Sequence, residues 1–145
     1  MPTIKVAEVK TTYTLLPEGK YEVYVEKYDL VETINGVERS SISLVVRDDV
    51  DSENGGRKIF TNISSAENFG WLINALSKAV GIAKNTEFDG LDDFLSEISG
   101  KSLVVKVKHR KGIKDPSKTY VNAVEFYPTT KGQYNPDGKD DNSVI

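Results

Sequence analysis

Alternating apolar and polar side chains predict that the first half of the chain is β-structure. Residues 20–30 and 41–47 each follow the two-residue period of a strand with one buried face. Between them lie Asn35 and Gly36, the dipeptide most typical of a tight hairpin turn. A third run, 57–63, is rich in β-branched and aromatic side chains. We therefore expect three strands here, with the first two joined as a hairpin.

The pattern changes to a helical period after residue 64. Apolar residues recur at three- and four-residue spacing as far as Val80, as on one face of a helix. Ser64 and Glu67 have the spacing of a capping box, and Gly81 is placed to end the helix. A second, shorter helix is expected over residues 91–98.

Two more alternating runs, 101–108 and 119–127, follow the helical region. Three strands, a helical insertion and two strands form the element order of an OB-fold barrel. We predict a mainly β fold with a helical insertion, a five-stranded OB-fold-like barrel whose helix lies between strands three and four. An SH3-like barrel or a small α+β sheet has a compatible order. This domain would span residues 15–128, between an N-terminal segment 1–14 and a flexible acidic C-terminal tail 129–145.

Composition narrows the chemistry that the chain can perform. It has no cysteine, so disulfides and thiolate metal sites are excluded, and His109 is its single histidine. The acidic loop 48–56 begins like a calcium-binding loop, but Phe60 stands where the twelfth-position glutamate belongs. No nucleophile motif is present. We expect no metal, no other cofactor and no enzymatic activity.

The chain also lacks the run of roughly 20 apolar residues that a membrane span needs. Its N-terminus has no apolar stretch followed by a cleavage site. We expect a soluble protein without membrane contact, located in the cytoplasm. The oligomeric state stays open.

Positive charge is concentrated in one window, residues 106–118. The window holds six Lys or Arg and one Asp, a formal charge of +5, whereas the other residues sum to −8 and the whole chain to −3. Phosphate neutralisation with release of counterions makes nucleic acid the first candidate partner. The alternative is a solvated hairpin that its lysines keep soluble. In an OB barrel this loop is one of two that enclose an oligonucleotide.

Single-strand binding also needs rings on which bases stack. Tyr24 and Tyr28 fall on the non-core face of the first strand, and Phe60 lies beside Lys58 on the third. The alternative for the tyrosines is packing under the N-terminal segment or a helix, and Trp71 is expected in the core. The predicted nucleic-acid-binding residues are Lys106, Lys108, Arg110, Lys111, Lys114, Lys118, Tyr24, Tyr28, Arg47, Lys58 and Phe60.

The C-terminal residues combine acidic side chains with an apolar tip, a composition that recruits partner proteins in some disordered tails. The alternative is that these C-terminal residues have no specific function. The predicted partner-binding residues are Asp137, Asp140, Asp141, Val144 and Ile145.

Several segments resemble a family of phage and prophage proteins often labelled as of unknown function. They are residues 16–23 (LPEGKYEV), 56–60 (GRKIF) and 100–107 (GKSLVVKV), together with Asn68, Trp71 and Leu72 of the helical insertion. The resemblance covers residues 15–128. It implies an OB-fold single-stranded DNA-binding protein encoded near phage replication and recombination genes.

From the residues and the resemblance together, we expect a sequence-independent single-stranded DNA-binding protein that acts in phage or prophage replication or recombination. Its tail would bind replication or recombination proteins. The alternative is a protein-interaction or virion-associated small β-barrel module that binds no nucleic acid.

Overall fold

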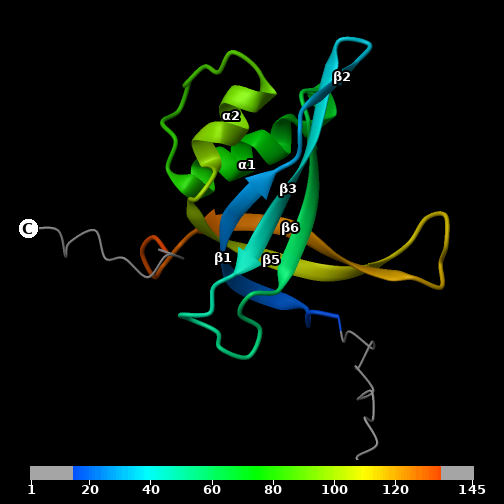
Figure 1. Cartoon of the computed structure of the whole chain (residues 1–145), viewed down its shortest axis with the longest axis vertical. Helices are drawn as coiled ribbons and strands as arrows, with labels where there is room; N and C mark the ends of the chain where they lie inside the picture. The colour runs from blue at the N-terminus through cyan, green and yellow to red at the C-terminus, as the bar shows by residue number, and fades with distance from the viewer. Residues whose placement is uncertain (1–14, 135–145) are drawn as a thin grey trace, which may run out of the picture.

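The computed structural model describes residues 15–134 as one antiparallel sheet with two helices inserted (Figure 1). Its strands are β1 (Gly19–Tyr28), β2 (Glu32–Ile34), β3 (Val37–Val46), β4 (Lys58–Ser64), β5 (Ser102–Lys111) and β6 (Thr119–Pro128). Between β4 and β5 lie a 3₁₀ turn (Glu67–Phe69), α1 (Gly70–Val80) and α2 (Leu91–Ile98).

Five of the six strands pair in the order β2-β3-β1-β5-β6. The sixth strand, β4, also pairs with β3. The prediction of a mainly β fold with a helical insertion is confirmed. Closure into a barrel is not observed, because β4 and β6 do not pair with each other within residues 15–134. The short strand β2 was not predicted; it follows a brief break after β1 and extends the Asn35-Gly36 hairpin, where both turn residues have positive φ.

The predicted alternation of β1 is present in the structure. Val23 and Val25 are fully buried, while Glu22, Tyr24 and Glu26 alternate with them on the outer face. Because β1 pairs with both β3 and β5, it is central to the sheet. On the inner face the core also includes apolar residues of both helices: Leu72, Leu76, Ala79, Leu91, Phe94, Leu95 and Ile98.

Both helices lie together at one end of the sheet (Figure 1), and α1 packs against β5 and β6. The predicted capping box is wrong, because Ser64 ends β4 and α1 begins only at Gly70. The predicted end is confirmed: Gly81 has φ of 84° and closes α1. The α2 helix spans the predicted residues, and the N–H of Leu91 donates to the Glu38 carboxylate on β3.

No helix within residues 15–134 is long and apolar enough to cross a membrane.

Candidate nucleic-acid interface

The β5–β6 hairpin extends well beyond the rest of the sheet (Figure 1). Val107 pairs with Gly19, the first residue of β1, and past this point the hairpin strands pair only with each other within the described chain. The connecting loop, residues 112–118, lies at its tip. The basic window of the sequence is therefore the projecting half of this hairpin.

A turn before β1 braces the base of the hairpin. The backbone N–H of His109 donates to the Glu18 carboxylate at 2.6 Å, just before β1 begins, where this edge of β5 has no paired strand. The His109 Nε2 lies 2.8 Å from the Leu16 carbonyl oxygen. A carbonyl only accepts hydrogen bonds, so Nε2 carries the proton. The single histidine thus has a structural role in the hairpin.

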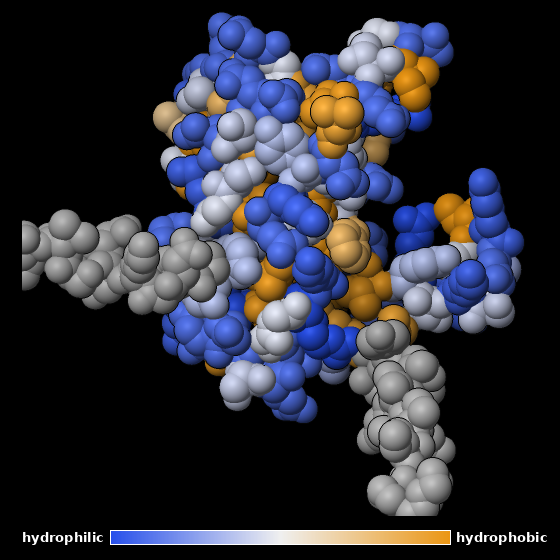
Figure 2. All heavy atoms as spheres, in the orientation of Figure 1, coloured by the Kyte–Doolittle hydropathy of each residue, from blue (hydrophilic) through white to orange (hydrophobic). Residues whose placement is uncertain are grey.

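A groove of about 780 Å³ runs between β4 and the projecting hairpin. Residues 58–60 form one wall, residues 110–115 and 118–122 form the other, and Leu15 contributes from the chain before β1. In Figure 2 the hairpin stands off from the body and is largely polar, with apolar surface between it and the body. Because β4 and β6 are the unclosed edges, the groove occupies the opening in the sheet.

Positive charge dominates the groove. Six of the eleven residues predicted to bind nucleic acid line it: Lys58, Phe60, Arg110, Lys111, Lys114 and Lys118. Lys58 forms an ion pair with Glu26 at 3.1 Å. None of the ion pairs found in the described part of the chain involves the hairpin cations beyond Lys106. Among the described residues that line the groove, Asp115 is the one acidic residue, and its carboxylate already accepts from the Ser117 N–H and hydroxyl.

Two exposed rings lie on opposite walls of the groove. Phe60 on β4 is 64% exposed, and Tyr120 on β6 is 53% exposed. Tyr120 is directly opposite Arg110 across the hairpin, so the ring and the guanidinium share one face. A Cβ built on Gly112 would lie 2.9 Å from the Tyr120 ring, which shows how closely this ring approaches the loop backbone.

Sequence analysis missed Tyr120. In the segment 119–127, Val121 and Ala123 face inward, which leaves Tyr120 on the opposite face. The alternation was visible, but the register that pairs this ring with Arg110 was not.

Lys106 and Lys108 are not in the groove lining. Lys106 is opposite Glu125 on β6 and forms an ion pair with it at 3.3 Å. Hydrogen bonding from Tyr127 and then from Lys106 lowers the pKa of Glu125. Lys108 is exposed beside Asn122, on the same hairpin face as Arg110.

Two of the rings predicted for stacking make contacts inside the protein. Tyr24 is partly buried, and its ring centroid lies 5.0 Å from that of Tyr134. The hydroxyl of Tyr28 donates to Asp92 on α2 at 3.0 Å. The alternative in which Tyr28 packs against a helix is the one that the structure shows. Trp71 was expected in the core, but it is 57% exposed on α1.

Arg47 was predicted to contact nucleic acid, but the structure buries its side chain, which is only 2% exposed. Its guanidinium donates two hydrogen bonds to Asp49, at 3.0 and 2.7 Å, and one to the Gly132 carbonyl. Glu22 lies 3.9 Å away as a second carboxylate. Hydrogen bonding from Arg47 lowers the pKa of Asp49.

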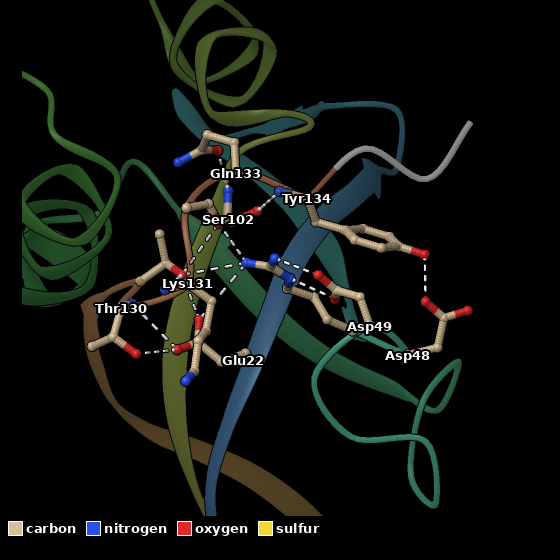
Figure 3. A network of polar contacts seen from close by, with 11 residues as sticks. Glu22, Asp48, Asp49, Ser102, Thr130, Lys131, Gln133 and Tyr134 are labelled. Carbon is tan, nitrogen blue, oxygen red and sulfur yellow. Dashed lines mark hydrogen bonds and ion pairs between the residues drawn. The ribbon is translucent and has the colours of Figure 1, made fainter. Parts of the chain in front are cut away.

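Residues 129–134, which we had assigned to the flexible tail, lie against the outer face of the sheet; we call them the strap. Figure 3 shows Thr130 beside Glu22, Gln133 beside Ser102, and Tyr134 beside Asp48. Tyr134 donates from its N–H to Ser102 and from its hydroxyl to Asp48 at 2.6 Å, and this second bond raises the pKa of Tyr134 to about 12. The predicted tail residues lie outside the described residues: Asp137, Asp140, Asp141, Val144 and Ile145.

The acidic loop between β3 and β4 forms no metal-binding cluster. The described residues contain no group of three or more His, Cys, Asp or Glu side chains arranged to hold a metal ion. Asp51 instead accepts hydrogen bonds from the Glu53 and Asn54 backbones and from the Asn54 amide, which close the loop on itself.

Two comparisons relate the chain to known proteins. A family model described as "Protein of unknown function (DUF669)" matches residues 2–137. A comparison with curated proteins finds no match.

Proposed function

The chain belongs to the DUF669 family, and we propose that it binds single-stranded DNA without sequence preference and catalyses no reaction. The groove between β4 and the β5–β6 hairpin would hold the strand. The role would be to coat displaced strands during phage or prophage replication or recombination, with further proteins recruited through the C-terminal residues.

The observation that carries the proposal is the joint presence of cations and exposed rings in one open groove. Arg110, Lys111, Lys114 and Lys118 would neutralise phosphates, and Phe60 and Tyr120 would stack on bases. Base–aromatic stacking contributes about 1–3 kcal/mol per base and tolerates any sequence. Duplex DNA hides its base faces, so exposed rings favour a single strand.

The fold supports the same function. An OB-fold is a partly open five-stranded Greek-key barrel that binds oligonucleotides between its loops. Five of the strands here lie in the order β4-β3-β1-β5-β6, with helices between β4 and β5. We propose that this sheet is a partly open OB-like barrel, and that the unpaired edge between β4 and β6 serves as the binding groove.

The acidic remainder of the molecule is compatible with this role. Residues outside 106–118 carry a formal charge of −8. Because the net negative charge lies outside the hairpin, the hairpin would be the favoured point of approach for a polyanion.

An oligothymidine titration at several salt concentrations tests the proposal. A variant with Arg110, Lys111, Lys114 and Lys118 changed to Ala should bind more than roughly tenfold more weakly at low salt. Its plot of log affinity against log salt should be shallower by roughly three units, because single strands contribute about 0.7 per phosphate contact.

The matched control removes four positive charges far from the groove, at Lys27, Lys78, Lys84 and Lys101, and should leave affinity and slope within about twofold of the parent. A parent protein that does not bind oligothymidine at low salt, or a hairpin variant with unchanged affinity, would disprove the function.

The second candidate is a protein-interaction or virion-associated module. The exposed Trp71 on α1 favours it, because exposed tryptophans are enriched where proteins meet. This candidate predicts no oligothymidine binding in the titration above.

A further inference from the structure

We propose that Ile113 at the hairpin tip is a wedge that inserts into stacked bases, so that the preferred ligand is a junction between single-stranded and duplex DNA. The inference rests on the proposed function, since the groove would hold the single-stranded part. It adds a second element, the duplex end, that the groove itself does not require.

The first observation is the exposure of Ile113 and the charges around it. Its side chain is 81% exposed and belongs to the groove lining. Lys111 and Lys114 lie close to it in the chain, and Lys118 closes the loop. Asp115 is also near, but its carboxylate accepts from Ser117. An apolar group flanked by lysines matches a ligand that is anionic outside and apolar inside, which is the arrangement of stacked bases between phosphate backbones.

The second observation is that the loop holds Ile113 in a defined position. The Gly112 N–H donates to the Lys118 carbonyl at 2.8 Å, and the Lys118 N–H donates to the Asp115 carbonyl at 3.0 Å. A Cβ on Gly112 would lie 2.7 Å from the Asp115 carbonyl oxygen, so the loop is closed tightly at this point. Isoleucine is β-branched and stiff at χ1, which suits a rigid wedge.

The third observation is the geometry of the whole hairpin. It is a two-stranded ribbon that projects from the body, and its base is braced by the Glu18–His109 hydrogen bond (Figure 1). Two-stranded ribbons fit DNA grooves, and apolar side chains such as isoleucine insert between base steps in proteins that kink DNA. A strand held between Phe60 and Tyr120 would leave the groove beside the tip, where a duplex end would meet Ile113.

Leu30 provides a matched comparison within the same molecule. It is 87% exposed in the short break between β1 and β2, so it is an apolar side chain of similar size and exposure. Its immediate neighbours in the chain are Asp29 and Val31, followed by Glu32, so the nearby charges are negative and repel phosphate. Exposure alone therefore does not distinguish Ile113; its basic surroundings and its place in the groove do.

The test compares three labelled probes by fluorescence anisotropy: a strand of about 12 thymidines, a DNA hairpin that carries the same strand as a tail, and the blunt hairpin. The tail is tried at either end of the hairpin. Wild type should bind one of the two tailed hairpins roughly tenfold more tightly than the free strand. This ratio is what the burial of one isoleucine side chain is expected to contribute to the binding free energy. 2-Aminopurine at the terminal base pair should brighten on binding as the pair is unstacked.

Ile113→Ala should abolish the preference and the brightening, so that the variant binds the tailed hairpin and the free strand with affinities within about twofold of each other. Leu30→Ala should keep the preference. The wedge is overturned if wild type binds oligothymidine but does not discriminate, or if Ile113→Ala retains the preference. Failure to bind oligothymidine would instead overturn the proposed function, and the wedge with it.

A cationic hairpin with an apolar tip also has the chemistry to bind a lipid surface. Vesicles containing anionic phospholipid test this directly. Vesicle binding that Ile113→Ala loses, without any junction preference, would assign the tip to membranes and overturn the wedge.

Discussion

The groove and the strap cluster both combine a cation with aromatic rings, but they differ in how far these side chains are exposed to solvent. In the strap cluster, defined as Tyr24, Arg47 and Tyr134, the guanidinium is buried and its centre lies 5.4 Å from the Tyr134 ring. In the groove, Arg110 and Tyr120 share a face of the hairpin, but both are exposed. One combination holds the protein together, and the other faces solvent.

The difference lies in the acidic groups within reach. Arg47 has Asp49 at hydrogen-bonding distance and Glu22 close by, so its charge is neutralised inside the protein. The hairpin has Asp115, but that carboxylate is directed to Ser117. A cation that is paired with carboxylates of the same protein stabilises the fold. Cations that have no such internal partner remain able to bind an external anion.

Arg47→Ala should produce the largest change in the free energy of unfolding, a loss of about 3 kcal/mol. The substitution leaves Glu22, with only 9% of its side chain exposed, without its cation and removes the anchor of the strap. Urea unfolding measures the effect. Arg110→Ala is the control and should change stability by less than about 0.5 kcal/mol. Equal losses in the two variants would contradict the contrast between the two regions.

Phe60→Ala and Tyr120→Ala should each weaken oligothymidine binding by about 1–3 kcal/mol, because each removes one stacking surface. Stability should hardly change, since both rings are more than half exposed. The measurement is the binding titration at fixed salt. Trp71→Ala removes a ring of similar exposure from α1 and should leave binding unchanged. A loss with Trp71→Ala, and none with the groove variants, would place the interface on α1.

The smallest effect concerns the Tyr134 hydroxyl. Its hydrogen bond to Asp48 raises the pKa from 10.0 to about 12. Since the folded pKa exceeds the unfolded one, this contribution to stability is complete below pH 10 and is lost as the pH rises through about 12. Asp48→Asn should lower the pKa, as measured by NMR titration of the tyrosine Cζ signal. An unchanged Tyr134 titration in Asp48→Asn would contradict the structural assignment of this bond.

Much of the fold could be predicted because it depends on local patterns. The two-residue period around Val23 and Val25 identified β1, and Asn35-Gly36 identified the hairpin. The predicted start of α1 was wrong because Ser64 and Ser65 do not cap the helix. Ser64 is the last residue of β4, and the hydroxyl of Ser65 accepts a hydrogen bond from the Glu38 N–H. Local spacing cannot show that a distant strand competes for a hydroxyl.

The site was harder to predict because it depends on register and long-range partners. Charge pointed to the β5–β6 hairpin as the candidate site, but it gave no sign that Arg47 would meet Gly132, 85 residues away in the chain. The strap has the composition of a flexible tail, yet Ser102 and Glu22 bind it largely through backbone and short polar groups. Such contacts leave little trace in hydrophobic periodicity.

The strap also fixes where Tyr134 lies relative to the hairpin tip. Tyr134 is bound to Ser102 at the beginning of β5, and the hairpin tip follows Lys111 at the end of the same strand. Nine residues of extended chain separate these points by roughly 30 Å. Immobilising the protein through a linker attached after Tyr134 would therefore leave the groove open to DNA, and a dye at that position would report on the hairpin by energy transfer rather than by contact.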